Sequence, residues 1–67
     1  MINFRLNGES VELENDVSVS EFLSTQGYEL KFIALERDGQ ILTKMQWQVA
    51  MMSEGKSYEV VEFVGGG

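Results

Sequence analysis

Apolar and polar residues alternate over two short segments at the start of the chain. Residues 2–6 (INFRL) and 10–14 (SVELE) both show this alternation. A period of two is typical of a strand that buries one face. Asn7-Gly8 lies between the segments, and this pair favours a tight hairpin turn because both residues tolerate positive φ. We therefore expect the chain to open with a β-hairpin.

The spacing becomes helical after this hairpin. Apolar residues recur at i, i+3 and i+4 from Val19, which predicts a short amphipathic helix over residues 19–26. Ser18 and Glu21 stand in the positions of a capping box at its start. Gly27 is a typical residue at which a helix stops. The apolar stripe of this helix is expected to cover the hairpin.

The rest of the chain predicts three more strands. In order, it carries a strand over 32–37, an Asp38-Gly39 hairpin turn, a short strand at 41–42, a 3₁₀ turn and loop over 44–52, and a strand over 58–64. One helix can cover one face of such a sheet. The order predicts an α+β fold with a mixed sheet of four or five strands, in which the first and last strands are adjacent and parallel.

The last predicted strand has two different faces. Glu59, Val61 and Phe63 share one face, and we expect it to be buried because it carries two large apolar residues. The full predicted core is Phe4, Leu6, Leu13, Phe22, Leu23, Leu35, Val61 and Phe63. The opposite face then carries a candidate partner-docking surface made of Val60, Glu62 and Val64. Valines that only favour a strand conformation are the alternative explanation of this face.

The composition restricts the chemistry. The chain has 67 residues, so it is one small domain, and it contains no cysteine and no histidine. It therefore lacks a thiolate nucleophile, an imidazole base and the usual ligands of zinc or iron–sulfur sites. Glu12, Glu14 and Asp16 are spaced as in a calcium loop, but Val17 stands where that loop requires glycine. We expect no metal site and no enzymatic activity of its own.

The net charge of −6 restricts the partners. An acidic surface repels nucleic acid and anionic membranes, and it suits a partner protein with a basic face. Solubility alone is the simpler explanation of this charge. No signal peptide and no membrane-length apolar run is visible, so we expect a cytoplasmic protein.

Three glycines end the sequence, at Gly65, Gly66 and Gly67. The predicted organisation is a domain over 1–64 and a flexible tail over 65–67. Three extended residues reach about 10 Å, enough to carry a terminal carboxylate into the active site of another protein. A frayed chain end is the alternative.

Several short motifs, taken in order, resemble the sulfur carrier family of thiamine biosynthesis. They are Asn7-Gly8, the Glu-Arg-Asp-Gly segment at 36–39, Lys44-x-x-Trp47, and the closing Val-x-Phe-Val-Gly-Gly-Gly at 61–67. The resemblance covers Ile2 to Gly67 and departs from the family at Gly55-Lys56, where Gly-Asp is frequent. It implies the ubiquitin-like β-grasp fold, which the small subunit of molybdopterin synthase shares.

The resemblance also implies the chemistry and the partners. An adenylating enzyme uses ATP and Mg²⁺ to join AMP to the Gly67 carboxylate, which Gly65 and Gly66 carry into its site. Sulfur delivered by a cysteine desulfurase replaces AMP, and a thiazole synthase consumes the thiocarboxylate. The carrier itself binds no cofactor. Carriers for molybdopterin or cysteine synthesis, a ubiquitin-like protein modifier and a plain binding module remain open alternatives.

Overall fold

The computed structural model describes residues 1–63, and residues 64–67 lie outside this description. The elements are β1 (Ile2–Leu6), β2 (Glu9–Leu13), α1 (Val19–Thr25), the 3₁₀ helix η1 (Leu30–Phe32), β3 (Ile33–Arg37), β4 (Gln40–Leu42), α2 (Lys44–Trp47) and β5 (Ser57–Glu62). The strands form one five-stranded sheet in the order β2-β1-β5-β3-β4. β1 and β5 are parallel neighbours, while the other pairs are antiparallel. This confirms the predicted mixed sheet and the adjacency of the first and last strands.

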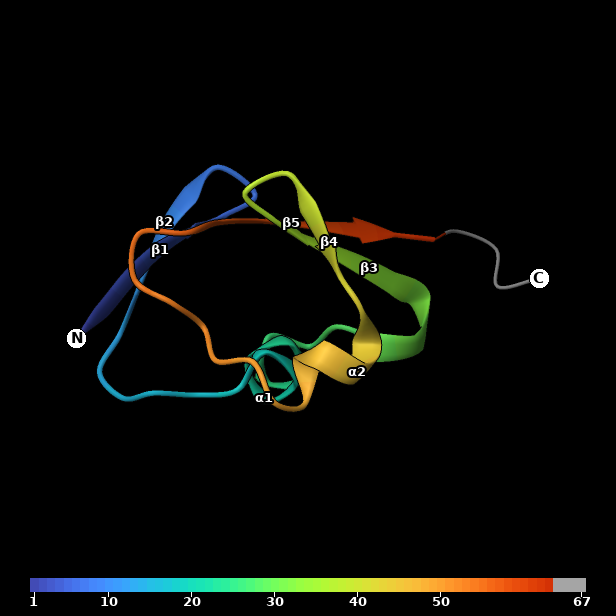
Figure 1. Ribbon diagram of the computed structural model, residues 1–67, viewed down its shortest axis with the longest axis horizontal. Coiled ribbons are helices and arrows are strands. Elements are labelled where there is room, and N and C mark those ends of the chain that lie inside the picture. Colours follow the sequence, from blue (N-terminus) through green and yellow to red (C-terminus); the bar gives the residue numbers. More distant parts are fainter. Residues whose placement is uncertain (64–67) are drawn as a thin grey trace.

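The sheet forms one layer, and α1 and α2 lie together on one side of it (Figure 1). The core fills the space between the two layers. Its buried members are Phe4, Val19, Phe22, Leu23, Ile33, Leu35, Leu42, Trp47, Met52 and Tyr58. No helix within residues 1–63 is long and apolar enough to cross a membrane.

Both predicted hairpin turns are present. Asn7 and Gly8 have φ values of 51° and 83°, and Asp38 and Gly39 have 51° and 84°. Two successive residues at positive φ give the turn whose twist matches that of the flanking strands. The two turns therefore fix the register of β1 against β2 and of β3 against β4.

The predicted helix is confirmed within one residue at each end. The Ser18 hydroxyl accepts a hydrogen bond from the Glu21 backbone N–H at 3.2 Å, and Gln26 is the C-cap residue. A complete capping box occurs elsewhere, at the start of α2. There the Thr43 hydroxyl accepts from the Gln46 N–H, and the Gln46 side chain accepts from the Thr43 N–H.

The expectation of a 3₁₀ turn over 44–52 is therefore wrong for its first part, which is one turn of α-helix. The sequence signal for this helix was Thr-Lys-Met-Gln, a Thr-x-x-Gln capping pattern just before an apolar residue. Trp47 follows it and is 2% exposed. Burial of this indole holds the short helix on the core, because one helical turn is not stable by itself.

The predicted faces of the last strand are reversed. Tyr58 is fully buried and Val60 packs against the core, whereas Val61 and Phe63 are 49% and 55% exposed. The reason is the register of β5, which sets Val60 opposite the buried Leu35 of β3. Leu6 and Leu13 were also expected in the core and are half-buried beside it.

Candidate functional site at the end of beta5

β5 leads from the middle of the sheet to the glycine segment, so its end is the candidate site. Its first half is held on both sides. On the β1 side, Asn7 donates its backbone N–H to the Tyr58 carbonyl, and its Oδ1 accepts from the Val60 N–H, both at 2.8 Å. On the β3 side, the Asp38 N–H donates to the Ser57 carbonyl at 2.8 Å. Residues from both hairpin turns thus hold the same strand.

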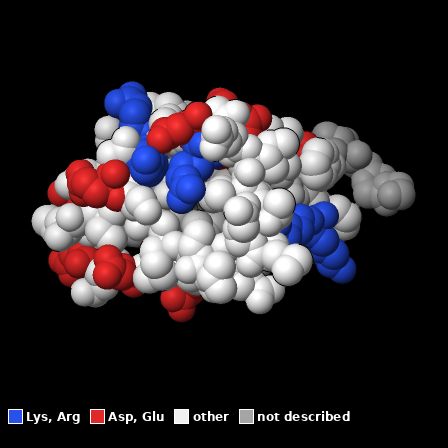
Figure 2. All heavy atoms as spheres, in the orientation of Figure 1, with Lys and Arg blue, Asp and Glu red and all other residues white. Residues whose placement is uncertain are grey.

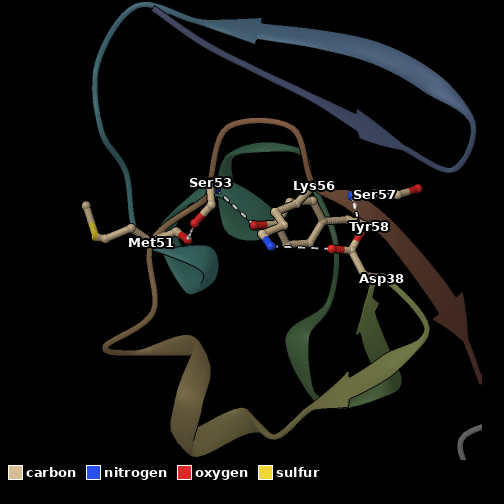
Figure 3. Close-up of polar contacts among 6 residues, drawn as sticks. All are labelled: Asp38, Met51, Ser53, Lys56, Ser57 and Tyr58. Carbon is tan, nitrogen blue, oxygen red and sulfur yellow. Dashed lines mark hydrogen bonds and ion pairs between the residues drawn. The ribbon is translucent and has the colours of Figure 1, made fainter.

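Asp38 makes a second contact with β5, shown in Figure 3. Its Oδ1 accepts from the Ser57 N–H at 2.9 Å, and its Oδ2 lies 3.5 Å from Nζ of Lys56. The hydrogen bond from Ser57, together with the charge of Lys56, lowers the pKa of the Asp38 carboxyl below its usual value. The ionised carboxylate therefore joins the second hairpin turn to the start of β5.

Tyr58 anchors the same half of the strand in the core. Its ring meets the Phe4 ring edge to face, with centroids 5.4 Å apart. Its hydroxyl accepts a hydrogen bond from the Ser53 N–H at 2.9 Å (Figure 3). This buried hydroxyl has its partner, so the ring is fixed at both ends.

The second half of β5 is held differently. Pairing with β1 ends at Tyr58, whereas pairing with β3 continues to Glu62. One further bond, from the Phe63 N–H to the Phe32 carbonyl at 2.7 Å, extends this pairing. The strand therefore approaches the glycine segment with the support of one neighbouring strand.

The side chains of this half form an apolar patch on the sheet face that the helices do not cover. Val61 lies opposite Ala34, and Phe63 follows on the same face. Ile41 of β4 shares the face and is 68% exposed. We call Ala34, Ile41, Val61 and Phe63 the outer patch.

The structure does not bring the predicted docking residues together as a free surface. Val60 is half-buried against the core, and Glu62 is exposed. Val64 and the predicted carrier and tail residues Gly65, Gly66 and Gly67 lie outside the described residues. The outer patch was missed because we assigned Val61 and Phe63 to the core. The signal that could have found it is that β5 carries apolar residues on both faces, so one apolar face must lie outside.

The described residues offer little chemistry of their own. Within residues 1–63, no group of acidic side chains is arranged to hold a metal ion. Figure 2 shows the charged side chains spread over the surface in view, with basic groups at two separate places.

Comparison with known proteins settles the family. The model of the ThiS family matches residues 4–67. The chain belongs to the ThiS family. It is 30% identical to the sulfur carrier protein ThiS of Bacillus subtilis, over 94% of this chain and 97% of that protein.

A second relative is much longer than this chain. The chain is 29% identical to a thiazole synthase of Paramagnetospirillum magneticum, over 92% of this chain but only 19% of that protein. It thus spans about a fifth of this relative. Among solved structures, the crystal structure of the thiamine biosynthesis protein ThiS from Geobacter metallireducens matches with a TM-score of 0.81 and 23% identity, over 98% of this chain and 100% of that one. This likeness confirms the β-grasp fold.

Proposed function

We propose that this member of the ThiS family is a sulfur carrier in thiamine biosynthesis, and that Gly67 carries the sulfur as a thiocarboxylate. The observation that carries the proposal is the family match over residues 4–67, which includes the glycine segment. The relative named as a sulfur carrier supports it along nearly its whole length. The proposal requires Gly67 to be the last residue of the mature chain.

The chemistry requires a partner. A C-terminal carboxylate has a pKa of about 3.5, so it is an anion at neutral pH and a poor electrophile. In the proposed first step, a carboxylate oxygen attacks the α-phosphorus of ATP and pyrophosphate leaves. In the second step, sulfur at the oxidation level of hydrosulfide attacks the acyl carbon and AMP leaves with the bonded oxygen. The net change is one oxygen replaced by one sulfur.

Three partners have separate roles in this proposal. An adenylating enzyme supplies the ATP and Mg²⁺ site. A cysteine desulfurase supplies the sulfur as a persulfide, which a thiol reductant brings to the hydrosulfide level by two-electron reduction. A thiazole synthase consumes the sulfur. The P. magneticum relative named thiazole synthase, which contains a segment similar to this chain, supports the last role. In this scheme the chain is a substrate of enzymes and not a catalyst.

The outer patch is the surface that we propose for docking the adenylating partner. It lies beside the residues that lead into the tail, and three of its side chains, those of Ile41, Val61 and Phe63, are already exposed. Exposed apolar patches of this kind are typical of interaction sites. The outer patch takes the docking role that we expected of Val60, because a half-buried side chain that packs on the core is not free to bind a partner. Glu62 is an exposed charge at the end of β5, on the opposite face of the strand from Val61 and Phe63.

Intact-protein mass spectrometry tests the proposal. The full chain is incubated with ATP, Mg²⁺, the adenylating enzyme from the same organism and a sulfur donor. We expect the mass to change by one oxygen-to-sulfur exchange, located in the C-terminal peptide, and the mass before reaction shows whether the chain ends at Gly67. Deleting Gly67 should abolish the exchange, and Gly66→Leu should slow it, while both variants stay folded.

Two outcomes would contradict the proposal. If neither AMP nor sulfur appears on the chain, the plain binding module replaces the carrier. If Gly67 is instead recovered in an isopeptide bond to lysines of other proteins, the chain is a protein modifier.

A further inference from the structure

A groove lies on the helical side of the molecule, away from the outer patch. It has a volume of about 330 Å³ and runs between α1, η1 and α2. Its lining residues are Ser20, Leu30, Lys31, Lys44, Trp47 and Gln48. The half-buried Leu30 gives the groove an apolar wall, and the Trp47 indole, which is 2% exposed, lies beneath it.

The groove is basic in an acidic protein. Lys31 and Lys44 line it, and no carboxylate is among its lining residues. These are two of only five cationic residues in a chain whose net charge is −6. Within residues 1–63, the lysine that forms an ion pair is Lys56, which pairs with Asp38 far from the groove. Figure 2 shows a basic group at the right of the view, near the start of β3 and α2 in Figure 1.

The walls of the groove are held in place. The Trp47 Nε1–H donates to the Leu42 carbonyl at 2.9 Å, which fixes the indole in the core. Nζ of Lys44 lies 5.8 Å from the centre of the Trp47 ring, a cation–π distance. The capping box between Thr43 and Gln46 fixes the backbone of the first turn of α2, which carries Lys44. Little ordering is then needed when a ligand binds, and preorganisation of this kind favours affinity.

We propose that this groove binds an acidic segment of a partner protein, with one apolar side chain of that segment placed against Leu30 and its carboxylates beside Lys31 and Lys44. A nucleic acid or an anionic membrane would meet the same lysines but would be repelled by the rest of this acidic surface. A second copy of this chain has acidic residues at Glu12, Glu14 and Asp16, but such a head-to-tail contact would link further copies into rings or open chains. A partner protein can present one acidic segment to the two lysines while the rest of its surface is neutral or basic, so it avoids both conflicts. The proposal does not depend on the role of Gly67.

An NMR titration of the ¹⁵N-labelled full chain tests it. The probe is a synthetic peptide with a central leucine between aspartates and glutamates, and its control has asparagine and glutamine at the acidic positions. We expect the acidic peptide to shift the Trp47 indole N–H and the backbone amides of Lys31 and Gln48, and the neutral peptide to bind much more weakly.

Three lysine variants make the test specific. Lys31→Gln and Lys44→Gln should each lower the affinity roughly two- to fivefold, as expected for loss of one exposed ion pair. The matched control Lys56→Gln removes the same charge far from the groove and should leave the affinity unchanged. Equal binding of both peptides, shifts that map elsewhere or an equal loss in the Lys56 variant would overturn the proposal. Shifts at the groove that depend on protein concentration without peptide would also overturn it, because they would assign the groove to a second copy.

Discussion

The two halves of β5 lie in one strand but are held in different ways. From Ser57 to Val60 the strand is held from both sides, because Ser57 and Tyr58 pair with β1 and Tyr58 to Val60 pair with β3. This half also has a buried tyrosine and hydrogen bonds from both hairpin turns. From Val61 to Phe63 it pairs with β3 alone, and its two apolar side chains are about half exposed. The first half therefore belongs to the stable interior of the sheet, and the second belongs to the surface that a partner can reach.

If Gly67 carries sulfur as proposed, this difference shows how a small domain can present a reactive end. The end must be accessible, but it must also leave the domain in a fixed direction. Fixing the first half of the strand supplies the direction, and leaving the second half uncovered supplies the access. Substitutions in one half at a time test this difference.

The largest effect is expected at Tyr58. Tyr58→Ala should cost about 3–5 kcal/mol of unfolding free energy, because it removes a fully buried aromatic ring and leaves a cavity. Urea denaturation measures this cost. Tyr58→Phe is the matched control, which keeps the ring and loses only the hydroxyl that accepts from Ser53, so it should cost about 1 kcal/mol. If Tyr58→Ala is as stable as the parent, the first half of β5 does not belong to the stable interior of the sheet.

The neighbours Val60 and Val61 test the boundary directly. Val60→Asp should cost about 2 kcal/mol or more, because it places an unpaired carboxylate against the core. Val61→Asp should cost less than about 1 kcal/mol, since its side chain faces solvent. The same Val61 variant should bind the proposed adenylating partner more weakly, as measured by calorimetry. Equal stability of the two variants would show that the face assignment is wrong.

Asn7 tests the support from the first hairpin turn. Asn7→Ala should cost about 1–2 kcal/mol, because it removes the acceptor of the Val60 N–H and places alanine at positive φ. Asn7→Gly removes the same acceptor without the conformational cost. Its smaller loss of unfolding free energy therefore reports the contribution of the hydrogen bond alone. Faster amide hydrogen exchange at Val60 should accompany both changes. Unchanged exchange there would mean that Asn7 does not hold the strand.

The smallest effect is expected at Asp38, and it depends on pH. A lowered folded pKa means that the ionised carboxylate stabilises the folded state above the usual value of 3.8, and that this stability is lost as the pH falls through the folded pKa. Asp38→Asn keeps an oxygen acceptor for Ser57 but has no charge to titrate. The difference in unfolding free energy between the parent and the variant should thus be constant near neutral pH. In acid, the parent should lose stability relative to the variant. A difference that does not change with pH would exclude this role for the charge.

Much of the fold followed from local signals in the sequence. Asn7-Gly8 and Asp38-Gly39 favour positive φ whatever surrounds them, so both hairpins were predicted correctly. Ser18 and Gly27 mark the ends of α1 in the same local way. The family resemblance rested on motifs of this kind and on the glycine segment, and it needed no coordinates.

Two features were decided only by tertiary structure. The single turn of α2 is too short to be stable alone, and it exists because Trp47 is buried beneath it. Which face of β5 is buried depended on register. One face carries Tyr58 and Val60, the other carries Val61 and Phe63, and both pairs were equally apolar candidates for the core. Alternation shows that the two sets point to opposite sides, but it does not show which side is covered. Pairing of Tyr58 with Leu6 and of Val60 with Leu35 decided this, because those partners already faced the helices.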